Sequence, residues 1–559
     1  EAPPLPLLAA LLEVLEEEDV DAEDAGVAFP EDGAGNGSGG PFHIGEDGGS
    51  GGGGAARASG APGGRPARAQ AVLATLLNGI WLEPHAASLP RPPPEVLKLL
   101  AGIQLPPPGS RAGDAADGGL EMDEKSASKA AAGAAKHLGV RAPLVLLLLL
   151  LYQPEAHPTL AIAFASLTDP SLDDGAACSA NGGPRRTSAR HVAAAAPLHF
   201  GMLLKALVGK LQESAYALVL YCLVHRNVSF RRCVICRADV ADVVLVPILE
   251  ALQKLPTAPA PGAVPTGADG AAAGGGADSA AAGMPSAPPA QGLALLLTLL
   301  ELTGDRGFCE AASRTTLADG SRVLGNSRAV QNVAVSSLLI ALLLKVAHWN
   351  FATCRHAFFN RAVSGILANL AANGVERLHW YTAGRMIEVT TLLARNALKP
   401  LAGPPEPTEL HRAGMVREFL RSLTRLLSGC LRAPLVAKNC TLVYALQRAY
   451  PSQLASLEDD PEIGPPLLHV RAVVDWFQAQ CPPDDSGRGE ESSVQLARLE
   501  AASGRLPAEI QEMVAGGGRF AYRERLGSTA FFAPEVWREA RRLIPEHVCW
   551  SQPTGARAA

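Results

Sequence analysis

Two pairs of metal-ligand side chains lie near one another in the sequence. Cys222 and His225 are separated by two residues, and Cys233 and Cys236 follow with the same spacing. Thiolate and imidazole groups at such spacing are typical of structural zinc sites. However, both pairs lie in strongly apolar segments that favour helices, where cysteine packs as a small hydrophobic side chain. We therefore favour helical packing over a zinc site and predict no metal ligands and no cofactor.

Two histidines, His348 and His356, lie among several tryptophan and phenylalanine residues. A catalytic histidine needs a nucleophile and an orienting carboxylate, and no recognised motif supplies them here. The sequence also contains no metalloprotease, phosphate-loop or dinucleotide-binding motif. The acid pairs Asp459-Asp460 and Asp484-Asp485 are expected to be solvated. We predict that the protein is not an enzyme, with no catalytic residue and no small-molecule substrate, and that the two histidines are interfacial or hydrogen-bonded core residues.

The composition combines enough hydrophobic residues for a large core with many Gly and Pro residues, which favour segments outside a core. Of 559 residues, 48% are hydrophobic and 19% are charged, while 56 are Gly and 44 are Pro. The apolar content excludes a wholly disordered chain. The formal net charge of −6 provides no global basic field, so we expect no nucleic-acid partner. Ten cysteines are too few for a disulfide-based scaffold of this length.

Low-complexity segments divide the chain. Residues 1–69 form an acidic and then Gly-rich region, and residues 70–559 are predicted to be one helical array with insertions. The insertions are rich in Gly, Pro and small residues and cannot bury enough apolar surface to offset the entropy of ordering. We expect disorder near 106–136, 173–190, 256–291 and 482–491.

Between these segments the hydrophobic periodicity is helical. Val363, Ile366, Leu367 and Leu370 follow the spacing of one helix face, and Asn373-Gly374 supplies a stop. The same spacing or long apolar runs predict further helices over 211–224, 245–252, 293–302, 333–348, 416–427 and 470–477. Alternating strand patterns are hard to find, so we predict an all-α fold.

The short breaks between helices favour antiparallel pairs that stack on one another. A helix over Val333–His348 is apolar on nearly every side, so it needs neighbours in several directions. We predict an irregular α-solenoid of stacked helix pairs, similar to armadillo or HEAT arrays, because no fixed repeat period is evident. A compact multi-helix domain is the alternative. Its packing residues are expected to include Val363, Leu367, Leu420, Leu423 and Tyr444.

No segment is predicted to span a membrane. The strongest apolar run, Pro143–Tyr152, is much shorter than the roughly 20 residues required, and predicts a buried helix. The chain begins Glu1-Ala-Pro-Pro, so we expect its natural N-terminus to lie upstream. Basic residues at 231–237 and 517–559 can contact anionic lipids or acidic partners, although we favour an ordinary solvated surface. The sequons at Asn227 and Asn439 carry little weight.

Several segments, taken in order, resemble the dymeclin family. They include Tyr216–Asn227, Val246–Leu252, Leu299–Phe308, Cys354–Ala372 and Phe531–Trp537, together with shorter matches at Ser336–Leu339, Leu442–Leu446 and Cys549-Trp550. A weaker similarity extends to Val96–Leu100. None of these segments is a catalytic signature, and their order and combination carry the resemblance.

The resemblance implies a helical, non-enzymatic protein that associates peripherally with the cytosolic face of the Golgi apparatus and exchanges with the cytoplasm. It further implies a scaffold or adaptor role in Golgi organisation and vesicle trafficking, with other Golgi proteins as partners. Typical family members carry myristate on an N-terminal Gly, which would apply here only if the natural N-terminus has one. A single myristoyl chain gives marginal, reversible membrane binding. A soluble helical-repeat binding module unrelated to membranes is the alternative.

Overall fold

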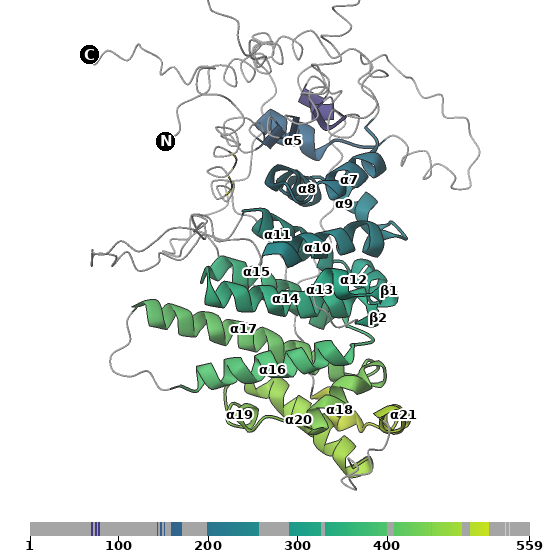
Figure 1. Ribbon diagram of the computed structural model, residues 1–559, viewed down its shortest axis with the longest axis vertical. Coiled ribbons are helices and arrows are strands. Elements are labelled where there is room, and N and C mark those ends of the chain that lie inside the picture. The colour runs from purple at the N-terminus through teal and green to yellow at the C-terminus, as the bar shows by residue number, and fades with distance from the viewer. Residues whose placement is uncertain are drawn as a thin grey trace, which may run out of the picture. The chain divides into compact units, whose positions relative to one another are not determined.

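The computed structural model describes a chain that is mostly helical, as predicted (Figure 1). The described residues are 158–169, 198–255, 290–325, 330–399, 407–448, 450–482 and 492–513, with single positions within 69–78 and 142–150, and Phe532 and Val536. Of the predicted low-complexity regions, only edge residues fall within this set, and Ala290 and Gln291 begin helix α11. The chain forms two compact units, with residues 51–234 in the first and 235–522 in the second.

The first unit contains four described helices: α5 (Pro158–Ala165), α7 (Phe200–Gly209), α8 (Ser214–Arg226) and α9 (Val228–Ile235), whose last residue begins the second unit. Helices α7 and α8 pack together, and the rings of Phe200 in α7 and Phe230 in α9 form a T-shaped pair with centroids 5.3 Å apart. The described leucines of the predicted run at 143–152 are helical and buried, as expected for a core segment.

The corner between α8 and α9 is held by one buried side chain, Asn227. Its Oδ1 accepts a 2.7 Å hydrogen bond from the amide of Phe230, which caps α9. Its Nδ2 donates to the carbonyl oxygens of Phe164 at 2.7 Å and Leu167 at 3.0 Å, at the end of α5. Asn227 is completely buried, so this sequon is a structural clamp between three helices.

The second unit contains the remaining described elements. They are a π-helical turn (Ala241–Leu245), α10 (Val246–Lys254), α11 (Ala290–Thr303), α12 (Arg306–Arg314), β1 (Thr316–Asp319), α13 (Ser321–Leu324), β2 (Gln331–Ala334), α14 (Val335–Ala352), α15 (Ala357–Asn373), α16 (Trp380–Ala397), α17 (Pro407–Leu431), a 3₁₀ turn η4 (Val436–Asn439), α18 (Cys440–Arg448), α19 (Ser452–Ala455), α20 (Gly464–Gln480), α21 (Ser492–Ser503) and α22 (Ala508–Glu512).

The longer helices of this unit pack in two parallel series (Figure 1). In one series α11 contacts α15, α15 contacts α17, and α17 contacts α20. In the other, α10 contacts α14, α14 contacts α16, and α16 contacts α18. Consecutive helices also touch across the series, as α14 does with α15 and α16 with α17. Each interior helix is therefore covered on several sides.

A small β-hairpin precedes α14, where a helix was predicted to start at Val333. Strand β2 pairs antiparallel with β1, with Leu317 opposite Val333 and Thr316 opposite Ala334. The prediction of helix at Val333 is therefore wrong by two residues. The cause is visible in the sequence, because Val333 and Ala334 are buried and apolar and continue the pattern of α14 without interruption.

Helix α14 is the one described helix that is long and apolar enough to cross a membrane. Its 18 residues have a mean hydropathy of 1.5, and 72% of them are buried inside the protein. It packs against α10, α12, α15 and α16. This is the environment of a core helix, and it explains why α14 is apolar on nearly every side.

The predicted packing residues mostly lie in the core. Val363, Leu367, Leu420 and Leu423 are completely buried, which confirms the stripes of α15 and α17. Tyr444 is half-buried instead, with the Arg448 guanidinium 5.0 Å from its ring. A tyrosine can keep its ring packed while its hydroxyl stays solvated. Helical spacing alone therefore overestimates the burial of Tyr444.

Candidate functional site

The four zinc candidates are divided between two helices and the segment that follows them. Cys222 and His225 belong to α8, Cys233 belongs to α9, and Cys236 follows the end of α9. Cys222 is buried and Cys236 is exposed, while the His225 ring stacks on Tyr221 at 5.5 Å. Among the described residues, no group of three His, Cys, Asp or Glu side chains could hold a metal ion.

The two histidines among aromatic residues have different environments. His348 is exposed on α14. His356 caps α15, where its Nδ1 accepts a 3.4 Å hydrogen bond from the amide of Phe359, and burial lowers the pKa of its imidazole. His356 therefore forms a hydrogen bond at a helix terminus, as predicted, whereas His348 lies on the surface.

Of the acids expected to be solvated, Asp459 is exposed but Asp460 is not. Only 11% of the Asp460 side chain is exposed, and it forms an ion pair with Arg417 of α17. Its Oδ1 also accepts hydrogen bonds from the amides of Glu462 and Ile463, which start the turn into α20. The expectation of solvation is therefore wrong for Asp460, because its carboxylate links two helices. Asp484 and Asp485 lie outside the described residues.

Asn439 is a buried side chain that forms three hydrogen bonds to the backbone of the second unit. Its Nδ2 donates to the carbonyl oxygens of Val375 at 2.7 Å and Cys430 at 2.9 Å, and its Oδ1 accepts from the amide of Leu378 at 3.1 Å. Thr441 donates a further 2.6 Å hydrogen bond to the Leu378 carbonyl. Both polar members of the second sequon thus fix the connection between α15 and α16, and Asn439 is completely buried.

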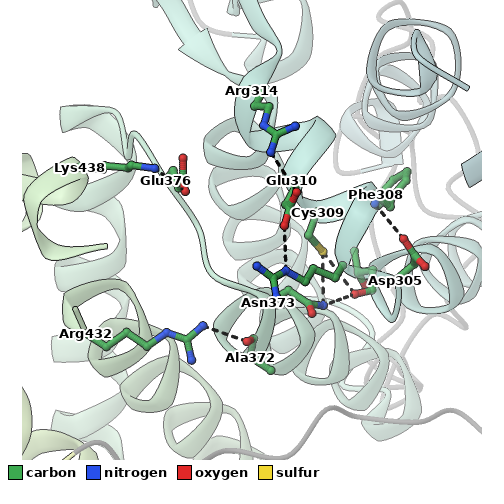
Figure 2. A network of polar contacts seen from close by, with 12 residues as sticks. Asp305, Phe308, Cys309, Glu310, Arg314, Ala372, Asn373, Glu376, Arg432 and Lys438 are labelled. Atoms are coloured by element: carbon green, nitrogen blue, oxygen red, sulfur yellow. Dashed lines mark hydrogen bonds and ion pairs between the residues drawn. The ribbon is translucent and has the colours of Figure 1, made fainter. Parts of the chain in front are cut away.

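A second polar cluster joins α11, α12, α15 and α17 (Figure 2). Nδ2 of Asn373, at the end of α15, donates to the Thr303 carbonyl at 2.9 Å and lies 3.6 Å from Sγ of Cys309. Arg432 donates to the adjacent Ala372 carbonyl at 2.9 Å. These hydrogen bonds satisfy carbonyl groups at the C-terminal ends of α11 and α15, which have no partner within their own helix. The cluster therefore has a structural role.

A buried histidine lies between α17 and α20. His469 is completely buried, and its Nδ1 lies 2.9 Å from Oγ of Ser428. Its Nε2 has no hydrogen-bond partner among the described residues. Burial lowers the pKa of the His469 imidazole to about 4, because the charged form would lose its hydration. The imidazole is therefore neutral at physiological pH.

Several large apolar side chains of the second unit are exposed on its surface. Trp380, at the first turn of α16, is 64% exposed and contacts His379 and Tyr381 edge-on or tilted. Leu398 and Leu410, at the other end of the α16–α17 pair, are also exposed. Exposed tryptophan and clustered exposed leucine are features of interaction surfaces. The second unit thus exposes apolar side chains at both ends of the α16–α17 pair, whereas buried asparagines such as Asn369 and Asn439 hold its helices together.

Comparison with known proteins shows to which family the chain is similar. A family model described as "Dymeclin: Dyggve-Melchior-Clausen syndrome protein" matches residues 113–538. Curated dymeclins from Mus musculus and Gallus gallus are each 24% identical over 358 residues, covering 61% of this chain and 47% of the relative. Dymeclin of Drosophila melanogaster is 22% identical over 355 residues, covering 57% of this chain and 43% of the relative.

The chain thus spans about half the length of the curated relatives it matches. No solved structure matches. The family model covers most of the sequence, including the described helices of both units. This chain belongs to the dymeclin family.

Proposed function

We propose that this protein is a non-enzymatic scaffold that associates peripherally with the cytosolic face of Golgi membranes. It would support Golgi organisation and secretory vesicle traffic by holding partner proteins there. The observation that carries the proposal is the dymeclin family match over residues 113–538. Membership in this family supports a non-enzymatic protein.

The architecture we infer for this scaffold is an irregular α-solenoid. Its support is the pair of helix series in the second unit, in which each helix contacts the helix two positions further along. Stacking of this kind gives a surface that grows with each added pair and can engage extended partners. The irregular helix lengths, from the 9 residues of α18 to the 25 of α17, explain why no repeat period is visible.

The hydrogen bonding of the buried polar side chains also favours a scaffold. Asn227, Asn369 and Asn439 are buried and donate hydrogen bonds to backbone carbonyls of neighbouring helices. Such groups make helix packing specific and rigid, which a binding platform requires. A nucleophile held by a base and an orienting acid would need a different arrangement.

The runner-up is a soluble helical-repeat module that binds proteins away from membranes. The exposed Trp380 with its neighbours His379 and Tyr381 favours it, because tryptophan and tyrosine are enriched at protein–protein binding centres. The two hypotheses differ in what the natural N-terminus should contain. A Met-Gly start suited to myristate favours the membrane scaffold.

Depletion and rescue test the proposed function. We expect cells depleted of the protein to show dispersed Golgi stacks and slower export of a secretory reporter, and the full-length protein to restore both. A variant lacking the exposed tryptophan, Trp380→Ala, separates partner binding from folding, because the side chain is mostly solvated. Normal Golgi morphology and normal export after complete depletion would contradict the proposal.

A further inference from the structure

The far end of the α16–α17 pair projects from its neighbours. Residues 395–399 at the end of α16 and 409–414 at the start of α17 are all exposed. Six consecutive helical residues cover every side of a helix, so the start of α17 has no packed face. In Figure 1 this end of α17 extends beyond the ends of α15 and α16.

Both helix ends lie at the same end of the pair. Helices α16 and α17 pack against each other, and only residues 398–406 separate them in sequence. A connection this short joins antiparallel neighbours. We call this end the tip, and define it by six exposed residues, Leu392, Arg395, Leu398, Lys399, Leu410 and Arg412.

The tip combines apolar side chains with cations that pair with no acid in the described part of the chain. Leu410 is 52% exposed, and Leu392 and Leu398 are each 41% exposed. Further along the same helices, Arg385 is paired with Glu388 and Arg417 with Asp460. Within the described part of the chain, by contrast, Arg395, Lys399 and Arg412 form no ion pair. The acid in these two exposed stretches is Glu409.

We propose that the tip docks on an anionic phospholipid surface, with its leucines entering the headgroup boundary and its three cations facing the lipid phosphates. This inference rests on the proposed membrane association and names the surface and the lipid chemistry responsible for it. The charge of the tip complements an anionic bilayer, and leucine flanked by Lys or Arg is suited to the interface.

Shape and residue types favour a bilayer over a protein partner. The centres of protein interfaces are packed, desolvated pockets enriched in Trp, Tyr and Arg, and Leu is under-represented among their strongest contributors. The tip projects and presents leucine, with Trp380 at the opposite end of α16. A projecting set of leucines can enter a fluid boundary without requiring a complementary surface.

Vesicle flotation with the purified full-length chain tests this inference. The vesicles contain phosphatidylcholine alone or phosphatidylcholine with about a third phosphatidylserine. We expect binding to the anionic vesicles only, and weakening of that binding at high salt because surface charges are screened. Each cation near an anionic surface contributes roughly fivefold to partitioning, so R395Q/K399Q/R412Q should lose on the order of 100-fold.

A matched variant with the same change in charge provides the control. R306Q/R314Q/R322Q removes three arginines that are about three-quarters exposed elsewhere in the same unit, and it should bind within a few-fold of the natural protein. L398S/L410S should lose at least about tenfold without a change in charge. All substituted tip residues are exposed, so unchanged urea midpoints should show that folding is intact.

Two results would overturn the inference. One is the absence of natural-protein binding to anionic vesicles, the outcome expected if the tip instead docks on an acidic protein. The other is equal loss in the tip and control variants. Imaging the R395Q/K399Q/R412Q variant in cells distinguishes a failure of the tip inference from a failure of the proposed function. Golgi localisation retained by R395Q/K399Q/R412Q would reject the tip alone, whereas absence of the natural protein from the Golgi would reject the proposed function.

Discussion

The side-chain amide of Asn439 donates a 2.7 Å hydrogen bond to the carbonyl oxygen of Val375, 64 residues earlier in the chain. The same side chain holds the carbonyl of Cys430 and the amide of Leu378. One buried residue therefore fixes the end of α17 against the connection from α15 to α16. The packing of successive helix pairs depends on such connections as much as on apolar contact.

Replacing Asn439 by Ala should lower the free energy of unfolding by roughly 2–4 kcal/mol, because three buried backbone groups lose their partners. Urea denaturation followed by circular dichroism measures this change. Asn396→Ala provides the control, since Asn396 is exposed near the end of α16 and should change stability by less than about 0.5 kcal/mol. Equal losses from the two substitutions would refute the structural role of Asn439.

Substitutions of two glycines, Gly374 after α15 and Gly384 within α16, test the backbone conformation at the end of α15. Gly374 has φ +88°, and a Cβ there would lie 2.9 Å from Cδ1 of Leu435. Gly374→Ala should therefore destabilise the protein by about 1–3 kcal/mol. Gly384, in the second turn of α16, has nothing within 4 Å of the same position, so Gly384→Ala should stabilise the protein by about 0.5–1 kcal/mol. Thermal melts should move in opposite directions, and a shared direction would contradict this account.

Two leucines of α17 test where its buried face lies. Leu423 is completely buried, so Leu423→Ala should cost roughly 2–5 kcal/mol through lost burial and a residual cavity. Leu410→Ala on the exposed first turns should cost less than about 0.5 kcal/mol. Urea denaturation compares the two variants, because a shift of the midpoint with an unchanged m-value reports a change in the free energy of unfolding. A loss below ~1 kcal/mol for Leu423 would mean that the core stripe is misplaced.

The neutral state of His469 predicts how stability depends on pH. Burial holds its pKa near 4, below the value of 6.5 expected in the unfolded chain. The unfolded chain therefore binds the extra proton first, and stability is lost as pH falls below 6.5. The contribution amounts to about 2 kcal/mol at pH 5 relative to pH 8.

The variant His469→Gln should flatten this dependence between pH 6.5 and 4, as measured by urea titrations at each pH. Part of its effect at pH 8 will come from the altered contact with Ser428, so the slope is the informative quantity. An unchanged slope would show that His469 titrates alike in the folded and unfolded chains.

Hydrophobic spacing was sufficient to predict most of the helices. Val470, Val473, Val474 and Phe477 are buried along α20 as their periodicity indicates, and α15 ends at Asn373 before Gly374. These features follow from local sequence, because side chains three and four positions apart share one helix face. The hairpin before α14 was missed, since its apolar strand end merges with the helix.

The polar connections could not be predicted in the same way. Asn227 and Asn439 each match a short glycosylation pattern, while their partners Leu167, Val375 and Leu378 lie about 60 residues away in sequence. Asp460 was expected in solvent because it lies in a turn near Pro461, and its partner Arg417 comes from another helix. Such contacts depend on how helices stack, which no local pattern encodes. The exposed tip likewise required knowing which leucines remain uncovered.

The role proposed for this protein is that of a scaffold at Golgi membranes. Its most direct test is to tag the full-length protein and image it in its own cells beside a Golgi marker. We expect a cytoplasmic pool together with a clear enrichment that overlaps the marker. An exclusively nuclear or mitochondrial signal would contradict it.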